Sequence, residues 1–261
     1  MEAMHIAAKG DAGTTGIDIL VQGYPGKSVC HGALGWSTIA LLRHAGHVAL
    51  VDVGSFSQRG LIQGGLGARG LAPKDVTDVL LTHSHHDHSI NWTLFHHARI
   101  VIGRDEMEWA REQPWGETAV PELYVEKLDG WSTAAVVRDG EEVLPNVTAL
   151  EAPGHTPGHL IFLLEGADRD VIFTGDAAKN RAELVSLTAD MTYDQEVSQA
   201  SFEMIWELWR RRPGSVLIPG HDLPMALDDD RPRYLGTRDA AISAWFGDDL
   251  EQTTRIELAV D

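Results

Sequence analysis

Cysteine is almost absent from this chain, which has a single one, Cys30, in 261 residues. One cysteine excludes a disulfide within the chain and therefore a disulfide-stapled fold. No apolar run approaches the ~20 residues that a membrane-spanning helix needs, so we expect no membrane partner. The first residues lack the basic flank and continuous apolar stretch of a signal peptide. These absences predict a cytoplasmic protein.

Positive charge is also scarce, with 21 Lys and Arg against 39 Asp and Glu and a formal net charge of -18. Proteins that bind phosphate backbones present basic patches, so we expect no nucleic-acid partner, although a nuclease with a local basic groove stays open. The hydrophobic share of 43% is ordinary for globular proteins. The length suits one layered α/β domain spanning residues 1–261.

The most informative stretch is His83-Ser84-His85-His86-Asp87-His88, which follows the strand-like run Val79-Leu80-Leu81. His83 and His85 are two positions apart, so on an extended backbone they project the same way and can hold one cation. Asp87 and His88 follow where the chain must turn, within reach of a second cation. Imidazole and carboxylate donors suit zinc, manganese or iron. The alternative is a solvated, histidine-rich loop.

Three further residues of ligand type occur downstream, after or within strand-like segments. They are His155, Asp176 and His221, and a glycine lies directly before each of them. Glycine allows a tight turn and a close backbone approach at the end of a strand. The three residues therefore strengthen the prediction of a metal site.

The motif His-x-His-x-Asp-His, followed by His, Asp and His, resembles the signature of the metallo-β-lactamase superfamily, in its lactonase and glyoxalase II branch. The resemblance implies an α/β (α+β) fold, a four-layer αββα sandwich of two mixed β-sheets flanked by helices. It also implies that one metal is held by His83, His85 and His155. The other metal would be held by Asp87, His88 and His221, and Asp176 would bridge the two.

A complete ligand set implies two divalent metal ions, with Zn²⁺ as the default and Mn²⁺ or Fe²⁺ also compatible with the donors. Two such ions about 3.5–4 Å apart make a nucleophile from water. We expect a dinuclear hydrolase in which a metal-bridging hydroxide cleaves a small ester, lactone or thioester. Asp87 is a candidate catalytic residue, because a ligand carboxylate can also pass a proton to the leaving group.

Supporting residues are expected around the ligands. In the resembling family an Asp-x-Gly such as Asp52-Val53-Gly54 lies under the metal site, so Asp52 is expected to hydrogen-bond a ligand. His159, four residues after His155, is expected to support its loop by hydrogen bonding. The alternative for Asp52 is an ordinary turn residue at the end of a strand.

Lys179 marks a departure from the lactonases, which usually carry Tyr three residues after the bridging aspartate. It is a second candidate catalytic residue, able to stabilise an oxyanion or bind a substrate carboxylate. The alternative for Lys179 is a solvent-facing position on a loop. Tyr193 is then another candidate to supply the phenol that the lactonases have at this position. A phosphodiesterase or nuclease, a β-lactam hydrolase and a non-catalytic metal-binding module are the competing hypotheses.

The segment 103–131 is predicted to be helical in two pieces and is rich in aromatic residues. Such a cap can form an apolar wall for a small-molecule substrate, pack on the sheet, or supply a homodimer contact. Elsewhere we expect an edge strand at Ile17–Val21, a loop at residues 23–35 with His31 at the rim of the cleft, and a last helix at Arg238–Phe246. A final strand is predicted over residues 253–260.

Overall fold

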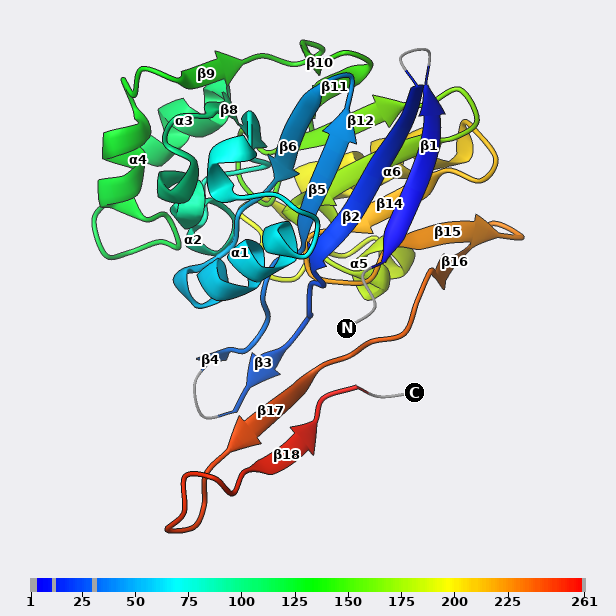
Figure 1. Ribbon diagram of the computed structural model, residues 1–261. Helices are drawn as coiled ribbons and strands as arrows, with labels where there is room; N and C mark the ends of the chain where they lie inside the picture. The colour runs from blue at the N-terminus through cyan, green and yellow to red at the C-terminus, as the bar shows by residue number, and fades with distance from the viewer. Residues whose placement is uncertain (1–3, 11–12, 30–31, 260–261) are drawn as a thin grey trace.

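Two β-sheets lie face to face in the computed structural model, which describes residues 4–10, 13–29 and 32–259 (Figure 1). Within these ranges each of the two sheets has seven strands, and two small hairpins complete the β-structure. The first sheet comes from the first half of the chain and the second sheet from the second half. The metal-ligand motif and its downstream partners are therefore divided between the sheets.

The first sheet has the strand order β1-β2-β5-β6-β7-β8-β9 among the described residues. It is antiparallel from β1 to β6 and parallel from β6 to β9. Its strands are β1 (His5–Gly10), β2 (Gly13–Val21), β5 (Ile39–His44), β6 (His47–Val51), β7 (Asp78–Leu80), β8 (Arg99–Gly103) and β9 (Ala134–Val137).

The second sheet has the order β10-β11-β12-β13-β14-β15-β16. Only the β13–β14 pair is parallel among its described ladders. Its strands are β10 (Glu142–Leu144), β11 (Val147–Glu151), β12 (Leu160–Glu165), β13 (Asp170–Gly175), β14 (Val216–Pro219), β15 (Met225–Asp228) and β16 (Arg231–Tyr234). Both sheets are thus mixed, as expected.

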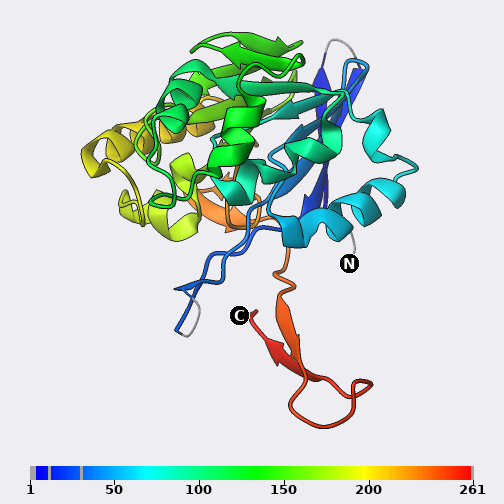
Figure 2. The same ribbon diagram turned by 90° about the vertical axis from the view of Figure 1, so that its left-hand side faces the viewer.

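Helices cover the outer face of each sheet, which gives four layers (Figure 2). The first sheet is covered by α1 (Arg59–Gly67), α3 (Arg104–Arg111), α4 (Glu122–Leu128) and the 3-10 turn η3 (Ile90–Phe95). The same half of the chain also contains α2 (His86–Ser89) and the 3-10 turns η1 (Phe56–Gln58) and η2 (Pro73–Asp75). The second sheet is covered by η4 (Asp176–Ala178), α5 (Arg181–Ser186) and α6 (Gln195–Arg210). The predicted αββα sandwich is confirmed.

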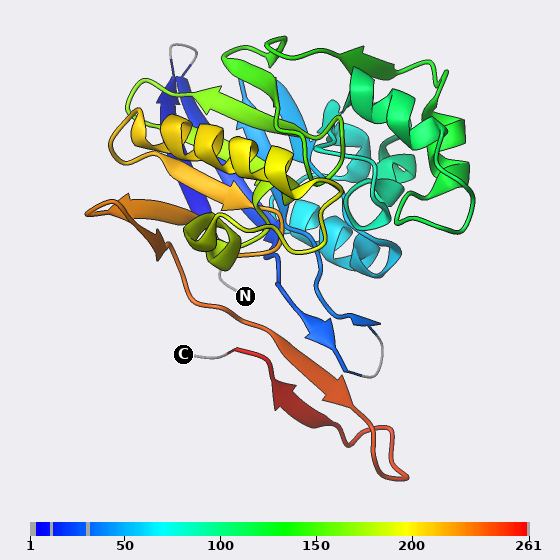
Figure 3. The same ribbon diagram turned by 180° about the vertical axis from the view of Figure 1, so that it is seen from behind.

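The core between the sheets is made of apolar side chains from both, such as Leu42 and Val101 facing Phe162 and Ile218. Burying apolar surface at about 25 cal/mol per Å² is what holds the two halves together. The helix α6 lies across the second sheet (Figure 3), where its Phe202, Ile205 and Trp209 are buried. Among the described helices, none is both long and apolar enough to cross a bilayer.

Three sequence predictions about the periphery differ from the structure. Ile17–Val21 lies in β2, but β1 covers its outer side, so it is not an edge strand. The predicted loop at 23–35 contains the short hairpin β3 (Lys27–Ser28) and β4 (Gly32–Ala33), and His31 lies outside the described residues. The predicted helix at Arg238–Phe246 is wrong, because β17 (Ala241–Ala244) pairs there with β18 (Thr254–Glu257). The backbone N–H and C=O groups of β17 form their hydrogen bonds with β18, whereas in a helix they would have bonded within the same segment.

Candidate metal centre

The seven predicted ligands all lie in loops or short helical turns that follow strands. His83–His88 come after β7, His155 follows β11, Asp176 follows β13 and His221 follows β14. The loops converge because β7 belongs to one sheet and the other three strands to the facing sheet. Residues separated by more than a hundred positions are thereby brought to one place between the two sheets.

The side chains form three groups whose potential ligand atoms lie within 4.8 Å of one another. The groups are His83, His85 and His155; His83, His88 and Asp176; and Asp87, His88 and His221. The first and third groups are the two ligand sets that the family resemblance implies. The second group contains Asp176, the residue that the resemblance places between them.

Asp176 directs its two carboxylate oxygens toward different histidines. Oδ1 lies 3.1 Å from His88 Nε2 and 3.2 Å from His221 Nε2, whereas Oδ2 lies 3.3 Å from His155 Nε2. His221 Nε2 is also 3.4 Å from Asp87 Oδ2. Asp176 therefore has the position of a residue that bridges two cations.

Glycine makes this convergence sterically feasible, as the sequence suggested. Gly175 has φ 49° and Gly154 has φ 129°, conformations that residues with a Cβ adopt at a cost. Gly220 has an ordinary φ, but an added Cβ would clash with Asp176 Oδ1. Each glycine before a ligand thus either adopts a backbone conformation that other residues disfavour or leaves room for a neighbouring ligand side chain.

The donor atoms fit divalent cations. His83 Nε2 and Asp176 Oδ1 are buried, yet neither has a hydrogen-bond partner among the described residues. Unpaired buried polar atoms are costly, and a cation would satisfy both. His85 Nδ1 and His155 Nε2 also face each other at 3.0 Å, an arrangement that a shared metal would stabilise.

Burial keeps one side of the centre uncharged. Burial, reinforced by neighbouring histidines, holds the pKa of His83 well below its ordinary value. Burial likewise lowers the pKa of His85 to about 4, despite the nearby Asp87 and Asp176 carboxylates. Neutral imidazole is the form that binds metal, so these histidines are ready to do so at neutral pH.

The other side of the centre is dominated by carboxylates. Burial opposes charge on His88, but Asp176, Asp87 and Asp52 outweigh it and raise its pKa well above the ordinary value. Burial opposes charge on Asp176 too, but His221 and His88 hold its pKa well below the usual range. In these opposite shifts the carboxylates and the protonated imidazoles stabilise each other, and bound cations would replace the protons there.

Asp52 supports the ligands in the way expected of it. Its Oδ2 lies 2.7 Å from His88 Nδ1, which leaves His88 Nε2 to face the centre. The same carboxylate accepts the Thr82 backbone N–H at 2.9 Å and the Thr82 hydroxyl. Asp52 has φ 55°, a strained conformation for a residue with a Cβ, and such strain is concentrated at functional sites.

His159 is buried and holds the bridging residue by its backbone. The Asp176 N–H donates to His159 Nε2 at 3.0 Å, and the His159 ring stacks on His83 at 4.8 Å. His155 is oriented separately, with Nδ1 lying 3.0 Å from the Met191 carbonyl and Nε2 turned to the centre. His159 therefore lies where the predicted supporting residue should.

Glu106 is a supporting residue that the sequence reading missed. It is buried in α3 and accepts the Ser84 N–H at 2.8 Å and the Ser84 and Thr156 hydroxyls, each at 2.6 Å. Burial raises the pKa of Glu106. Because Ser84 lies between two ligands and Thr156 follows His155, one carboxylate ties together the ligand loops of both sheets. The only local signal was an acidic residue in the first turn of a helix.

Lys179 lies beside the centre but does not face solvent. It is 9% exposed, and its Nζ is 3.1 Å from Glu183 Oε1. Glu183 also accepts the backbone N–H groups of Lys179 and Asp190, so it holds the loop that follows Asp176. Burial, reinforced by the positive charge of Lys179, holds the pKa of His155 well below its ordinary value. The Lys179 carbonyl also accepts the His221 backbone N–H at 2.8 Å, so Lys179 lies close to the ligands.

Two aromatic side chains line the accessible edge of the centre. The Trp109 ring lies 6.2 Å from the His85 ring and 6.1 Å from the Tyr193 ring. Tyr193 is 70% exposed and Met191 is 71% exposed. The segment 103–131 thus both packs on the sheet, through Met107 and neighbouring apolar residues, and reaches the site through Trp109.

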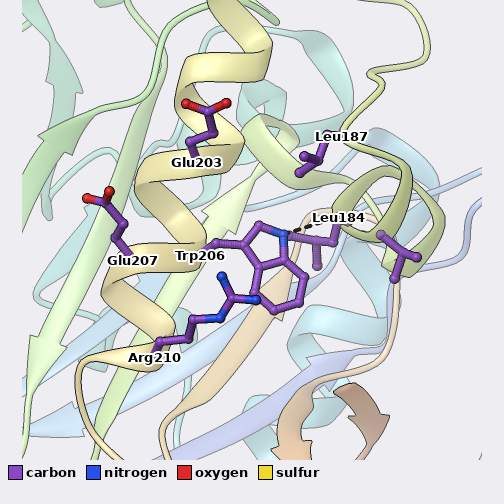
Figure 4. A pocket seen from close by; sticks show the side chains of 7 residues that line it. Leu184, Leu187, Glu203, Trp206, Glu207 and Arg210 are labelled. Carbon is purple, nitrogen blue, oxygen red and sulfur yellow. Dashed lines mark hydrogen bonds between the residues drawn. The ribbon is translucent and has the colours of Figure 1, made fainter. Parts of the chain in front are cut away.

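A separate hollow of about 420 Å³ lies between α5 and α6 (Figure 4). Trp206 forms its floor, donating from Nε1 to the Leu184 carbonyl at 2.9 Å, and Arg210 stacks over its ring at 4.4 Å. The remaining lining residues are Val185, Leu187, Glu203 and Glu207. The hollow includes none of the seven ligands and is not part of the metal centre.

The fold brings together, between facing sheets, three histidine-rich groups that could each hold a metal ion. The chain belongs to the metallo-beta-lactamase superfamily, whose profile matches residues 35–221. The match begins before β5 and ends at His221, so it contains every residue of the centre described above.

Curated relatives of the chain include an N-acyl homoserine lactonase from Bacillus cereus, which is 29% identical over 157 residues. That match covers 59% of each chain, so the chain spans about three-fifths of the relative's length. The metallo-beta-lactamase domain-containing protein 1 of Xenopus laevis is 32% identical over 181 residues, covering 67% of this chain and 66% of the relative.

Solved structures with the same fold include a dizinc quorum-quenching lactonase in complex with its product. It aligns with a TM-score of 0.71 and 15% identity, covering 91% of this chain and 99% of that one. An N-acyl homoserine lactone hydrolase aligns with a TM-score of 0.64 and 20% identity, covering 83% and 94%. At these identities the likeness establishes the fold.

Proposed function

We propose that this protein is a hydrolase that uses two divalent metal ions, by default zinc, to cleave a small lactone, ester or thioester. One observation carries the proposal: Asp176 lies between two groups of ligands and turns one oxygen toward each group. The family membership and the names of the lactonase relatives support the same reaction class.

Metal ions bound by these seven residues would lower the pKa of water to about 7 and so supply a nucleophile at neutral pH. Hydrolysis then forms a bond from the water oxygen to the carbonyl carbon and breaks the bond to the leaving oxygen, which takes up a proton. The protein holds the ligands rigidly through Asp52, Glu106 and His159, which limits reorganisation during the reaction.

We assign proton transfer to Asp87. Its side chain is 24% exposed, whereas the side chains of His88 and Asp176 are almost fully buried. Its Oδ2 lies 3.4 Å from His221 Nε2 on the accessible side of the centre. A carboxylate there can take a proton from water and give it to the leaving alkoxide.

The surroundings favour a substrate with an uncharged apolar group. Trp109 and Tyr193 offer ring surface next to His85, and Met191 extends it. The formal net charge of -18 disfavours a polyanionic substrate. Because Lys179 is paired with Glu183, we assign it to electrostatic support of the developing oxyanion and not to capture of a substrate carboxylate.

The test is proton release from an aliphatic γ-lactone by zinc-reconstituted protein, with His85→Ala as the inactive variant. His86→Ala is the matched control, since His86 neighbours His85 but is exposed and belongs to none of the ligand groups. We expect hydrolysis by the wild type and His86→Ala and its loss in His85→Ala. Absence of lactone hydrolysis by zinc-loaded wild-type protein would discard the lactone branch, and thioesters and phosphodiesters would be assayed next.

A further inference from the structure

The hairpin of β17 and β18 projects away from the two large sheets as an arm (Figures 1 and 2). The two strands pair only with each other in the described part of the chain. The arm is anchored at its base, where the Tyr24 hydroxyl donates to the Leu258 carbonyl at 3.1 Å and Arg238 pairs with Asp222. Beyond this base the arm extends into solvent.

This arm exposes several large apolar side chains. All four residues of β18 are exposed, and at the tip Trp245 is 56%, Phe246 76% and Leu250 83% exposed. A two-stranded hairpin is only marginally stable in water, whereas three or more strands can be stable. An open edge strand is also a template for another strand. The arm therefore has the properties of a pairing element.

Backbone geometry shows which groups of β18 are available. The Leu258 N–H donates to the Ala240 carbonyl at 2.8 Å, so Leu258 points its backbone N–H toward β17. Backbone direction alternates along a strand, so Ile256 also points toward β17, where it is paired with Ile242. Arg255 and Glu257 must then direct their N–H and C=O groups to the open edge.

We propose that this edge pairs with the same edge of a second copy of the chain, antiparallel and about a two-fold axis at Ile256. In that register Arg255 lies opposite Glu257 of the second copy, and Glu257 lies opposite its Arg255. Each opposed pair exchanges two backbone hydrogen bonds, and Ile256 meets its own counterpart as a non-hydrogen-bonded pair. The interface is isologous, as a two-fold dimer requires.

The charges of Arg255 and Glu257 favour a second copy of the chain as the partner and favour this register. Arg255 and Glu257 lie on the same face of β18, with Nε and Oε1 2.5 Å apart within one chain. Around the axis at Ile256, both charges of one copy meet opposite charges of the other, a stabilising cross-strand arrangement. Moving the axis by half a residue places Ile256 opposite either Arg255 or Glu257, which loses the match and puts apolar and charged side chains together.

The resulting four-stranded sheet also accounts for the apolar residues of the arm. Ile242 and Ile256 are cross-strand neighbours, so the dimer forms a continuous row of four isoleucines on one face. Antiparallel pairing places each tip, with Trp245, Phe246 and Leu250, beside the base of the other arm. The proposed dimer contact therefore involves residues 236–259 and not the aromatic segment 103–131.

A charge test separates pairing between copies from contacts within one arm. Light scattering after size exclusion should give the wild type twice its 28.5 kDa chain mass. Arg255→Glu and Glu257→Arg each place like charges opposite one another, so each should be a monomer. Mixing these two variants should restore a dimer, because their edges are complementary to each other although the charges within each chain still repel.

A cross-linking test fixes the axis. In a Cys30→Ser background, Ile256→Cys should form an intermolecular disulfide on mild oxidation, because opposite residues of a non-hydrogen-bonded pair are close. Ile242→Cys is the matched control, on the same face of the same hairpin but one strand away from the axis, and it should stay uncross-linked. Unchanged circular dichroism spectra would establish that the variants fold.

Three results would overturn the proposal. A wild-type protein that remains monomeric over the accessible concentration range has no such interface. A dimer that persists in both single charge variants uses another surface. Cross-linking of Ile242→Cys in preference to Ile256→Cys would place the contact on β17.

Discussion

Asp52, Asp87 and Asp176 are the same residue type, yet each has a different role at the metal centre. Asp52 is buried and bonded to Thr82 and His88, so it orients a ligand. Asp176 is buried and turns one oxygen toward His88 and the other toward His155, as the proposed bridging role requires. Asp87 is partly exposed, which gives it access to substrate. The three aspartates therefore differ in their burial and hydrogen-bond partners, although their side chains are chemically the same.

Replacing Asp87 by asparagine should slow turnover and leave substrate binding nearly intact. Asparagine keeps the shape of the side chain and one oxygen donor but cannot carry a proton at neutral pH. We expect kcat to fall by about 10²–10⁴-fold, the usual contribution of general acid–base catalysis, with KM changed far less. Steady-state kinetics on zinc-loaded protein would measure both, and wild-type kcat in Asp87→Asn would disprove the proton-transfer role.

Glu106→Ala should weaken metal binding although Glu106 contacts no metal. The Ser84 and Thr156 donors would lose their acceptor, and the two ligand loops would no longer be joined. Loss of such supporting hydrogen bonds costs about 10–100-fold in metal affinity. Competition with a chromogenic chelator would give the zinc affinity. Glu108→Ala, an exposed position two residues along α3, is the control, and equal affinities in the two variants would contradict the assignment.

At the scale of elements, the parallel strands β6, β7 and β8 depend on one buried carboxylate. Asp78 in β7 lies 2.8 Å from His47 Nδ1 of β6 and accepts from Arg99 Nε of β8 at 2.7 Å. Burial opposes its charge, but hydrogen bonds from Thr77, His47 and Arg99 outweigh burial and lower the pKa of Asp78. The charges therefore join the first residues of the three strands, at the end of β7 opposite to His83–His88.

Asp78 should make the protein sensitive to acid. Its folded-state pKa is below the unfolded value of about 3.9, so its contribution to stability is present above that value and is lost as pH falls through the folded-state pKa. Asp78→Asn should lower the free energy of unfolding by about 1.5–3 kcal/mol at pH 7, the contribution of hydrogen bonds to a charged group.

Urea denaturation at a series of pH values would test this. The difference between wild type and Asp78→Asn should shrink as the pH falls below about 4. Asp248→Asn, an exposed substitution in the arm, should differ little from the wild type throughout. A difference for Asp78→Asn that stays constant down to the acid limit would mean that its charge is not responsible.

At the scale of the whole molecule, the metal centre joins the two sheets. His83–His88 follow a strand of the first sheet, whereas His155, Asp176 and His221 follow strands of the second. Cations held by both sets would cross-link the halves of the chain in addition to the apolar core between them. Metal binding and folding stability should therefore be linked.

Removing metal should lower the melting temperature. Zinc at about 1,000 times its Kd would add about 4 kcal/mol to the free energy of unfolding, if it binds only the folded chain. Calorimetric scans in excess zinc and in a chelator should thus differ clearly for the wild type and His86→Ala. His83→Ala, which loses a ligand common to two of the three groups, should show a smaller difference. Superimposed wild-type scans would refute this linkage.

The amino-acid sequence by itself predicted the layered α/β class, which the structure confirms, and proposed the seven candidate ligands with Asp52 and His159 as supporting residues. These are local signals: residue types, short spacings and glycines at strand ends. The edge position of β1 and the strand at Ala241–Ala244 were decided by pairing with the next strand along the chain, which periodicity within a single segment does not encode. Only the tertiary structure showed that Glu106 joins both ligand loops and that Trp109 meets Tyr193. Those contacts join segments far apart in the chain, and their partners are set by how the two sheets pack.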